Sequence, residues 1–185
     1  RKLLESKSMH SSLIASIRSS MHEKSRETRE HADRLADMAC KIGGALELGD
    51  SQIAELELLS SLHDLGKIGI PERILDKPGP LTPEEWMEMQ KHPEIGYRIA
   101  QTSPELINVA KGILSHHERW DGKGYPQGLK GEDIPLLARI LSVVDSFDAM
   151  TSNRVYHEAI PVEYALKEIE ACSGSQFDPD IAALF

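Results

Sequence analysis

A histidine and an aspartate stand side by side in an apolar stretch, residues 58–71. Burying a carboxylate among apolar side chains is costly unless the group is paired or bound to a cation. Neighbouring residues of a helix point about 100° apart, so His63 and Asp64 can flank one ion, and the two oxygens of Asp64 can bridge two ions. Gly66 and Gly69 are expected to end this helix. We therefore predict that His63 and Asp64 form the centre of a multinuclear metal site, around which the other helices must pack.

The remainder of the chain is a series of segments with helical periodicity. Aromatic residues make up only 5% of the 185 residues, while helix-favouring Leu, Ala, Glu and Met are frequent. Helices are predicted at residues 1–23, 25–46, 51–65, 82–91, 93–101, 104–117, 135–151, 162–171 and 178–185. Residues 72–83 are expected to form a surface loop. The fold prediction is all-α: a single-domain helical bundle at residues 24–185, preceded by an amphipathic connecting helix at residues 1–23.

The net charge of the chain limits which partners are expected, and its cysteines limit which cellular compartment is expected. A net charge of −9 argues against binding of a nucleic-acid polymer, which depends on neutralising phosphates. It permits a small anionic ligand, because bound divalent cations reverse the local sign. Cys40 and Cys172 lack disulfide or zinc spacing, so a reducing, cytoplasmic location is expected. There is no apolar run of about 18 residues and no signal-peptide pattern, so this segment is expected to make no membrane contact.

The chain begins at Arg1 rather than at Met, and an upstream sensor or receiver domain is expected in the full-length protein. The helix at residues 1–23 could connect the bundle to that domain or pair with a copy of itself in a homodimer. Packing of this helix on its own bundle is an equally weighted alternative.

Six further histidines and carboxylates lie on or beside apolar helix faces. They are Glu27, His31, His92, His116, His117 and Asp145. Glu27 and His31 are four residues apart and therefore share one helix face, although an exposed pair is the alternative. Asp145 lies inside an apolar run and is expected to be a buried carboxylate, which needs a cation or several hydrogen-bond donors. Asp148, three residues later, could orient a nearby ligand. With His63 and Asp64, this mixed set suits iron, manganese or zinc, and it exceeds the ligands of one ion.

Four glycines and a proline make residues 119–131 a long irregular loop, of a length that is often functional. The loop brings the cationic and aromatic side chains Arg119, Lys123 and Tyr125 next to the paired histidines. The alternative is a structural loop whose glycines only satisfy turn geometry. Lys67, one turn after His63, could direct a cation into the same space, and Arg154 is a candidate phosphate contact.

Taken in order, these motifs resemble the HD-GYP family of the metal-dependent HD phosphohydrolase superfamily over residues 27–185. The matching runs are HDLGK at residues 63–67, HH at 116–117, WDGKGYP at 120–126, and ARI at 138–140 leading to DSFDAMTS at 145–152. The resemblance implies a helical bundle of the HD-domain type. It also implies a phosphodiesterase that hydrolyses cyclic di-GMP to pGpG or onward to GMP, by attack of a hydroxide that bridges two metal ions.

The resemblance also assigns roles to individual residues. The superfamily's ligands map onto His31, His63, Asp64 and Asp145, and the extra histidines of the HD-GYP branch map onto His92, His116 and His117. Glu27 matches the ligand of a third ion in some members, so two or three divalent ions, most commonly iron or manganese, are expected. Asp64 and Lys67 are the expected catalytic residues. The expected substrate contacts are Lys67, Lys123, Tyr125 and Arg154.

One departure from the family pattern bears on the substrate. After the arginine at position 154, members often carry proline, tyrosine and then lysine or arginine, whereas this chain has Val155, Tyr156 and His157. Because histidine is a weaker and titratable base, the choice among cyclic dinucleotides stays open. Two further readings also stay open, a non-catalytic receptor for a cyclic dinucleotide and a phosphohydrolase for another cyclic dinucleotide or nucleotide.

Overall fold

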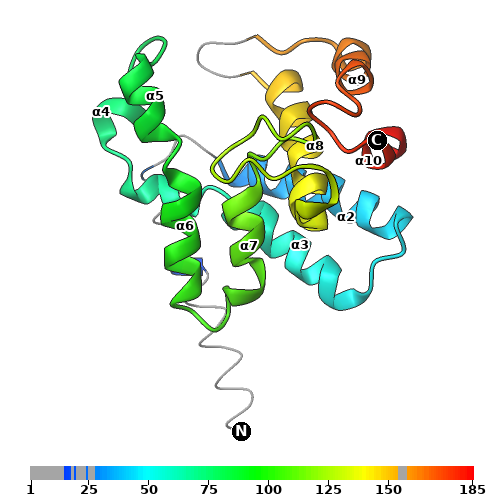
Figure 1. The fold of residues 1–185 in the computed structure, drawn as a ribbon, viewed down its shortest axis with the longest axis horizontal. Coiled ribbons are helices and arrows are strands. Elements are labelled where there is room, and N and C mark those ends of the chain that lie inside the picture. Colours follow the sequence, from blue (N-terminus) through cyan, green and yellow to red (C-terminus); the bar gives the residue numbers. More distant parts are fainter. Residues whose placement is uncertain (1–14, 18, 20–23, 25–27, 154–157) are drawn as a thin grey trace, which may run out of the picture.

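A computed structural model describes residues 15–17, 19, 24, 28–153 and 158–185, and these residues form a helical bundle (Figure 1). Its main elements are α2 (Arg29–Ala45), α3 (Asp50–Leu62), the 3₁₀ helix η1 (Leu65–Gly69), α4 (Glu72–Leu75), α5 (Pro83–Met89), α6 (His92–Gln101), α7 (Ile107–Ser115), the 3₁₀ helix η2 (Gly131–Asp133), α8 (Leu136–Thr151), α9 (Val162–Ala171) and α10 (Pro179–Leu184). Among the described residues there is no strand, only an isolated bridge between Ser173 and Phe177. The all-α prediction is confirmed.

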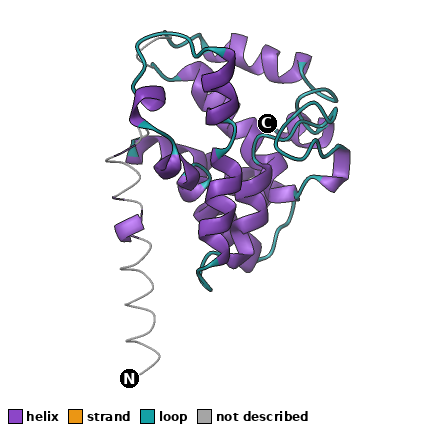
Figure 2. Ribbon diagram, turned by 60° about the vertical axis from the view of Figure 1, so that its left-hand side comes forward, coloured by secondary structure: helices purple, strands orange, loops and turns teal. Residues whose placement is uncertain are grey.

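The core forms where α2, α3, α7 and α8 pack their apolar faces together, with α6 lying against α7 and η1. Figure 2 shows the bundle from a second side, as packed helices joined by loops. Leu35, Leu59, Ile113 and Leu141, one from each of the four core helices, are completely buried. Removing such side chains from water is the main favourable contribution to folding. The functional side chains are therefore held on helices whose opposite faces are fixed by this core.

The segment around His63 differs from the prediction. Helix α3 ends at Leu62, His63 is its C-terminal cap, and Asp64 precedes η1. The N–H of Lys67 donates to the carbonyl of Asp64 at 2.9 Å, the tight pattern of a 3₁₀ turn. The cause is a close approach to α6, because a Cβ on Gly66 would lie 1.8 Å from the carbonyl oxygen of His92. The α-helix therefore gives way to a tighter turn before the glycine that was expected to end it.

Other boundaries follow the sequence closely, with two exceptions. Thr82 and Glu85 form the expected capping box at the start of α5. Helix α4 falls within residues 72–83, which were expected to be a loop, so that prediction is wrong for four residues. Helix α7 is shorter at both ends than the predicted 104–117. Most of the predicted connecting helix, residues 1–23, lies outside the described residues. No helix in the described part of the chain is long and apolar enough to cross a membrane.

Replacing Gly66 by alanine is expected to destabilise the fold by at least about 1–3 kcal/mol, the usual cost of overpacking. The added Cβ would meet the backbone of α6, which cannot move aside as a flexible side chain could. The measurement is urea-induced unfolding of the purified variant.

Gly44→Ala is the matched control, because Gly44 lies near the end of α2 and a Cβ there meets nothing within 4 Å. That variant is expected to be as stable as the parent or more stable by about 0.5–1 kcal/mol. Equal stability of the Gly66 and Gly44 variants would contradict the close packing of η1 on α6.

Candidate metal centre

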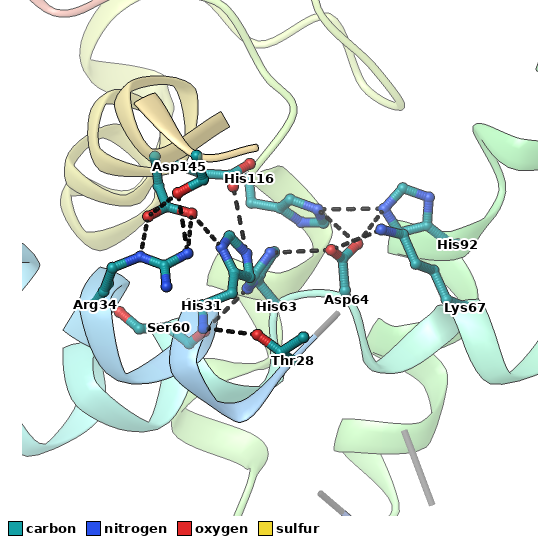
Figure 3. A network of polar contacts seen from close by, with 12 residues as sticks. Thr28, His31, Arg34, Ser60, His63, Asp64, Lys67, His92, His116 and Asp145 are labelled. Carbon is teal, nitrogen blue, oxygen red and sulfur yellow. Dashed lines mark hydrogen bonds and ion pairs between the residues drawn. The ribbon is translucent and has the colours of Figure 1, made fainter. Parts of the chain in front are cut away.

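Two groups of histidine and carboxylate side chains lie where α2, η1, α6, α7 and α8 approach one another (Figure 3). The first group is Asp64, His92, His116 and His117, and the second is His31, His63 and Asp145. Within each group, one possible ligand atom per residue lies within 4.8 Å of the others. The structure thus brings together seven of the eight predicted ligands, from segments far apart in the sequence.

Asp64 lies between the two groups. One carboxylate oxygen, Oδ2, is 3.0 Å from Nε2 of His63 in the second group. The other, Oδ1, is 3.1 Å from Nε2 of His92 and 3.8 Å from Nε2 of His116. Burial alone would raise the pKa of Asp64, but the nearby ammonium group of Lys67 is the main cause that holds it well below its usual range. Asp64 is therefore an ionised carboxylate with one oxygen toward each group.

Backbone carbonyls orient three of the imidazole rings. In each case Nδ1 faces the carbonyl oxygen three residues earlier: His63 and Ser60 at 3.1 Å, His92 and Met89 at 2.8 Å, His116 and Ile113 at 2.6 Å. A carbonyl oxygen only accepts, so Nδ1 must carry the proton in each hydrogen bond. In a neutral ring the lone pair is then on Nε2, the atom directed toward Asp64. Burial lowers the pKa of His116 well below its usual range and that of His117 to about 4, so these two rings are neutral at pH 7.

His31 is oriented by a carboxylate instead of a carbonyl. Its Nδ1 is 2.7 Å from Oδ2 of Asp148, which also accepts hydrogen bonds from the guanidinium of Arg34. Burial would raise the pKa of Asp148, but the hydrogen bonds from His31 and Arg34 lower it strongly. Nε2 of His31 is directed toward Asp145, at 3.7 Å. Contrary to the prediction, Asp145 is only partly buried, and Asp148, one turn later, is the buried carboxylate of α8.

The donor set fits divalent cations. Nε2 of His92 is 3.3 Å from Nε2 of His116, and when both rings are neutral with the proton on Nδ1, these two nitrogens present lone pairs to each other. Facing lone pairs repel each other, as they also repel the ionised Asp64, unless a cation lies among them. Within the described part of the chain, Nε2 of His31 is buried and has no hydrogen bond. Imidazole nitrogens with carboxylate oxygens suit iron, manganese or zinc.

The other residues that were predicted to belong to the site differ in their position relative to the cluster. Nζ of Lys67 is 2.9 Å from Oδ2 of Asp64, at the edge of the cluster. The ring of Tyr125 stacks on His117 with a centroid distance of 4.8 Å. Lys123 is exposed, and its backbone N–H donates to Asp121. Glu27 and Arg154 lie outside the described residues, as does His157.

Two residues that support the site were not predicted. Arg34 holds Asp148 behind His31, and its spacing of three residues from His31 was the available signal. Glu118 is buried directly after His117, and its carboxylate accepts hydrogen bonds from the N–H groups of Gln127 and Leu129, at 2.7 and 3.0 Å. Glu118 thereby folds the loop at residues 119–131 back over the histidine pair.

The chain is similar to known proteins over most of its length. Residues 9–181 match the family described as the HD domain. The chain is 45% identical over 161 residues to a Thermotoga maritima protein named cyclic di-GMP phosphodiesterase, covering 86% of this chain and 44% of the relative. It is 39% identical over 174 residues to the 3'3'-cGAMP-specific phosphodiesterase 2 of Vibrio cholerae, covering 93% of this chain and 33% of the relative. The chain spans less than half the length of these relatives.

Solved structures share the fold. The crystal structure of the cyclic GMP-AMP specific phosphodiesterase V-cGAP3 from V. cholerae superposes with a TM-score of 0.67 at 26% identity. The superposition covers 93% of this chain and 46% of that one. An HD-GYP-type protein from Bdellovibrio bacteriovorus, Bd1817, superposes with a TM-score of 0.66 at 23% identity, covering 83% of this chain and 49% of that one.

Replacing Asp148 by asparagine is expected to destabilise the metal-free protein at pH 7 by about 1.5–3 kcal/mol, the usual value of a hydrogen bond to a charged group. The folded-state pKa of Asp148 lies below its ordinary value of 3.8. Its contribution to stability is therefore complete above that value and is lost as the pH falls. The difference in unfolding free energy between parent and variant should be largest above pH 5 and shrink toward pH 2, in urea titrations across that range.

Asp37→Asn serves as the control, because Asp37 is exposed and pairs with Lys41 on the surface of α2. It should change stability little at any pH. A difference between parent and Asp148→Asn that stays constant from pH 7 to pH 2 would show that the charge of Asp148 does not matter.

Proposed function

Because the chain belongs to the HD domain family, in its HD-GYP branch, we propose that it is a metal-dependent phosphodiesterase that hydrolyses cyclic di-GMP to pGpG or onward to GMP. The observation that carries this proposal is the convergence of seven histidine and carboxylate side chains in two groups joined by Asp64. Paired metal ions in phosphodiester hydrolysis lie about 3.5–4 Å apart, and a carboxylate with one oxygen toward each ligand group could hold two ions at such a spacing.

Each group would hold one divalent cation, iron or manganese, which suit the mixed nitrogen and oxygen donors. When bound, such cations lower the pKa of water and offset the negative charge that develops on a phosphate during hydrolysis. Asp64, with one oxygen toward each group, would be a ligand shared by the two cations. Glu27 would supply a ligand to a third ion, four residues before His31 in the same segment.

The residues around the cluster would orient the substrate. Lys67 presents its ammonium group beside Asp64, where it can contact a phosphate oxygen or the leaving group. Asp148 and Arg34 hold His31 in place, and so keep its Nε2 directed into the second group. We propose further substrate contacts from Lys123, Tyr125 and Arg154.

A second substrate is favoured by a specific finding, the similarity to proteins of V. cholerae that are named for 3'3'-cGAMP. A lysine or arginine is common in the family at position 157, where this chain has histidine. This substitution is consistent with a different preference among cyclic dinucleotides. We further propose that residues 1–23 connect this domain to an upstream sensor or receiver domain, or pair with a second copy in a homodimer. We propose a cytoplasmic location for the protein.

The direct test is turnover by protein loaded with iron or manganese under reducing conditions. Cyclic di-GMP should be converted to pGpG or GMP, the metal-free protein should be inactive, and 3'3'-cGAMP should be assayed in parallel. Binding of either dinucleotide without any product, in protein shown to contain metal, would instead make the chain a receptor.

Asp64→Ala should lower the metal content of both groups and reduce turnover by more than about 100-fold, because a shared ligand is lost. The measurements are metal analysis and a product assay on the same preparation. Asp37→Ala, an exposed carboxylate on α2, is the control and should change neither. Retention of metal and activity by Asp64→Ala would exclude a shared role for this carboxylate.

A further inference from the structure

An exposed tryptophan lies at the end of a line of aromatic rings that leads to the metal centre. Trp86 on α5 contacts Tyr125 edge to face, with a centroid distance of 6.2 Å and an interplanar angle of 78°. Tyr125 in turn stacks on His117, at 4.8 Å and 26°. His117 belongs to the first group of candidate ligands. Two ring contacts therefore connect an exposed indole to a metal-ligand candidate.

The packing of α5 does not account for this tryptophan. No residue of α5 is buried, and Trp86 keeps 47% of its surface exposed. In Figure 1, α4 and α5 project away from the bundle formed by α2, α3, α7 and α8. The helix is held by ion pairs from α4 and the loop that follows it, Arg73 with Glu88 and Lys77 with Glu85. Trp86 thus lies outside the hydrophobic core, and its ring contacts Tyr125, which stacks on a candidate metal ligand.

The surroundings indicate which part of a ligand would bind there. Helix α5 has no lysine or arginine, and its Glu85 and Glu88 are paired with Lys77 and Arg73, so the helix offers no cation of its own to a phosphate group. A flat, uncharged ring needs no such cation. One face of Tyr125 is already covered by His117, which leaves Trp86 as the ring with free surface.

We propose that Trp86 is the base-stacking platform of this site: a nucleobase of the cyclic dinucleotide stacks on the indole while its phosphodiester lies at the metal centre. The inference rests on the proposed function and adds the recognition of the base. Stacking uses the face of a base and not its edge, so it tolerates different bases. Trp86 therefore contributes equally to binding of guanine and adenine, and the choice between dinucleotides is made elsewhere.

The test compares Trp86→Ala and Trp86→Phe with Met87→Ala, whose side chain is the exposed neighbour on α5 outside the line of rings. In metal-loaded protein, Trp86→Ala should raise KM for cyclic di-GMP and for 3'3'-cGAMP by a similar factor, between about 5-fold and 100-fold. It should leave kcat and metal content unchanged. Trp86→Phe should recover most of the loss, and Met87→Ala should behave as the parent.

An unchanged KM in Trp86→Ala would overturn the proposal. So would a fall in kcat at constant KM, which would mean that Trp86 only supports Tyr125. A loss for one dinucleotide and not the other would show that the residue reads the edge of the base.

A fluorescence titration separates this inference from the proposed activity. The chain has two tryptophans, so in a Trp120→Phe background the remaining indole is Trp86. Its emission should be quenched by cyclic di-GMP, with or without turnover. Turnover by the parent without quenching would refute the platform alone, whereas quenching without turnover would support the platform and refute the phosphodiesterase.

Discussion

The structure around the candidate centre depends on one buried charge, the carboxylate of Asp64. It lies among imidazole nitrogens with only 5% of its surface exposed. Such a group is tolerated only with compensation. Lys67 supplies part of it through its ammonium group, 2.9 Å from Oδ2, and one oxygen is directed toward each group of ligands. Three features of the fold surround this one carboxylate. They are the turn from α3 into η1, the close contact of Gly66 with α6, and the positions of His92 and His116.

Ring orientation at the site comes mainly from the backbone. The three histidines whose Nδ1 faces a carbonyl oxygen all lie at ends of helices, where carbonyl groups lack partners within the helix. Each ring satisfies such a group and is thereby fixed with Nε2 pointing inward. His31 lies in the first turn of α2, where N–H groups and not carbonyls are left over, so it takes a carboxylate from α8 instead. The second ligand group is consequently more dependent on tertiary contacts than the first.

Much of the fold was predictable, because helix boundaries are set by local chemistry. The capping box that starts α5 needs only Thr82 and Glu85, which lie within four consecutive residues. The bounds of α9 were predicted without error. The early end of α3 was not predictable, since it depends on the approach of α6 to Gly66 across about thirty residues of sequence. The relative burial of Asp145 and Asp148 was also misjudged. Both lie on the apolar helix α8, and only the position of His31 and Arg34 decides which of them is enclosed.

The sequence by itself determined the helices, the residue types with metal-binding chemistry and the motifs that they form. These properties follow from short-range periodicity and from the limited number of side chains that can bind cations. Only the tertiary structure decided that Asp64 lies between two groups, that Arg34 and Glu118 support them, and that Trp86 approaches Tyr125. Such contacts join elements that are distant in the chain, and their geometry is set by how helix faces pack, which no local pattern specifies.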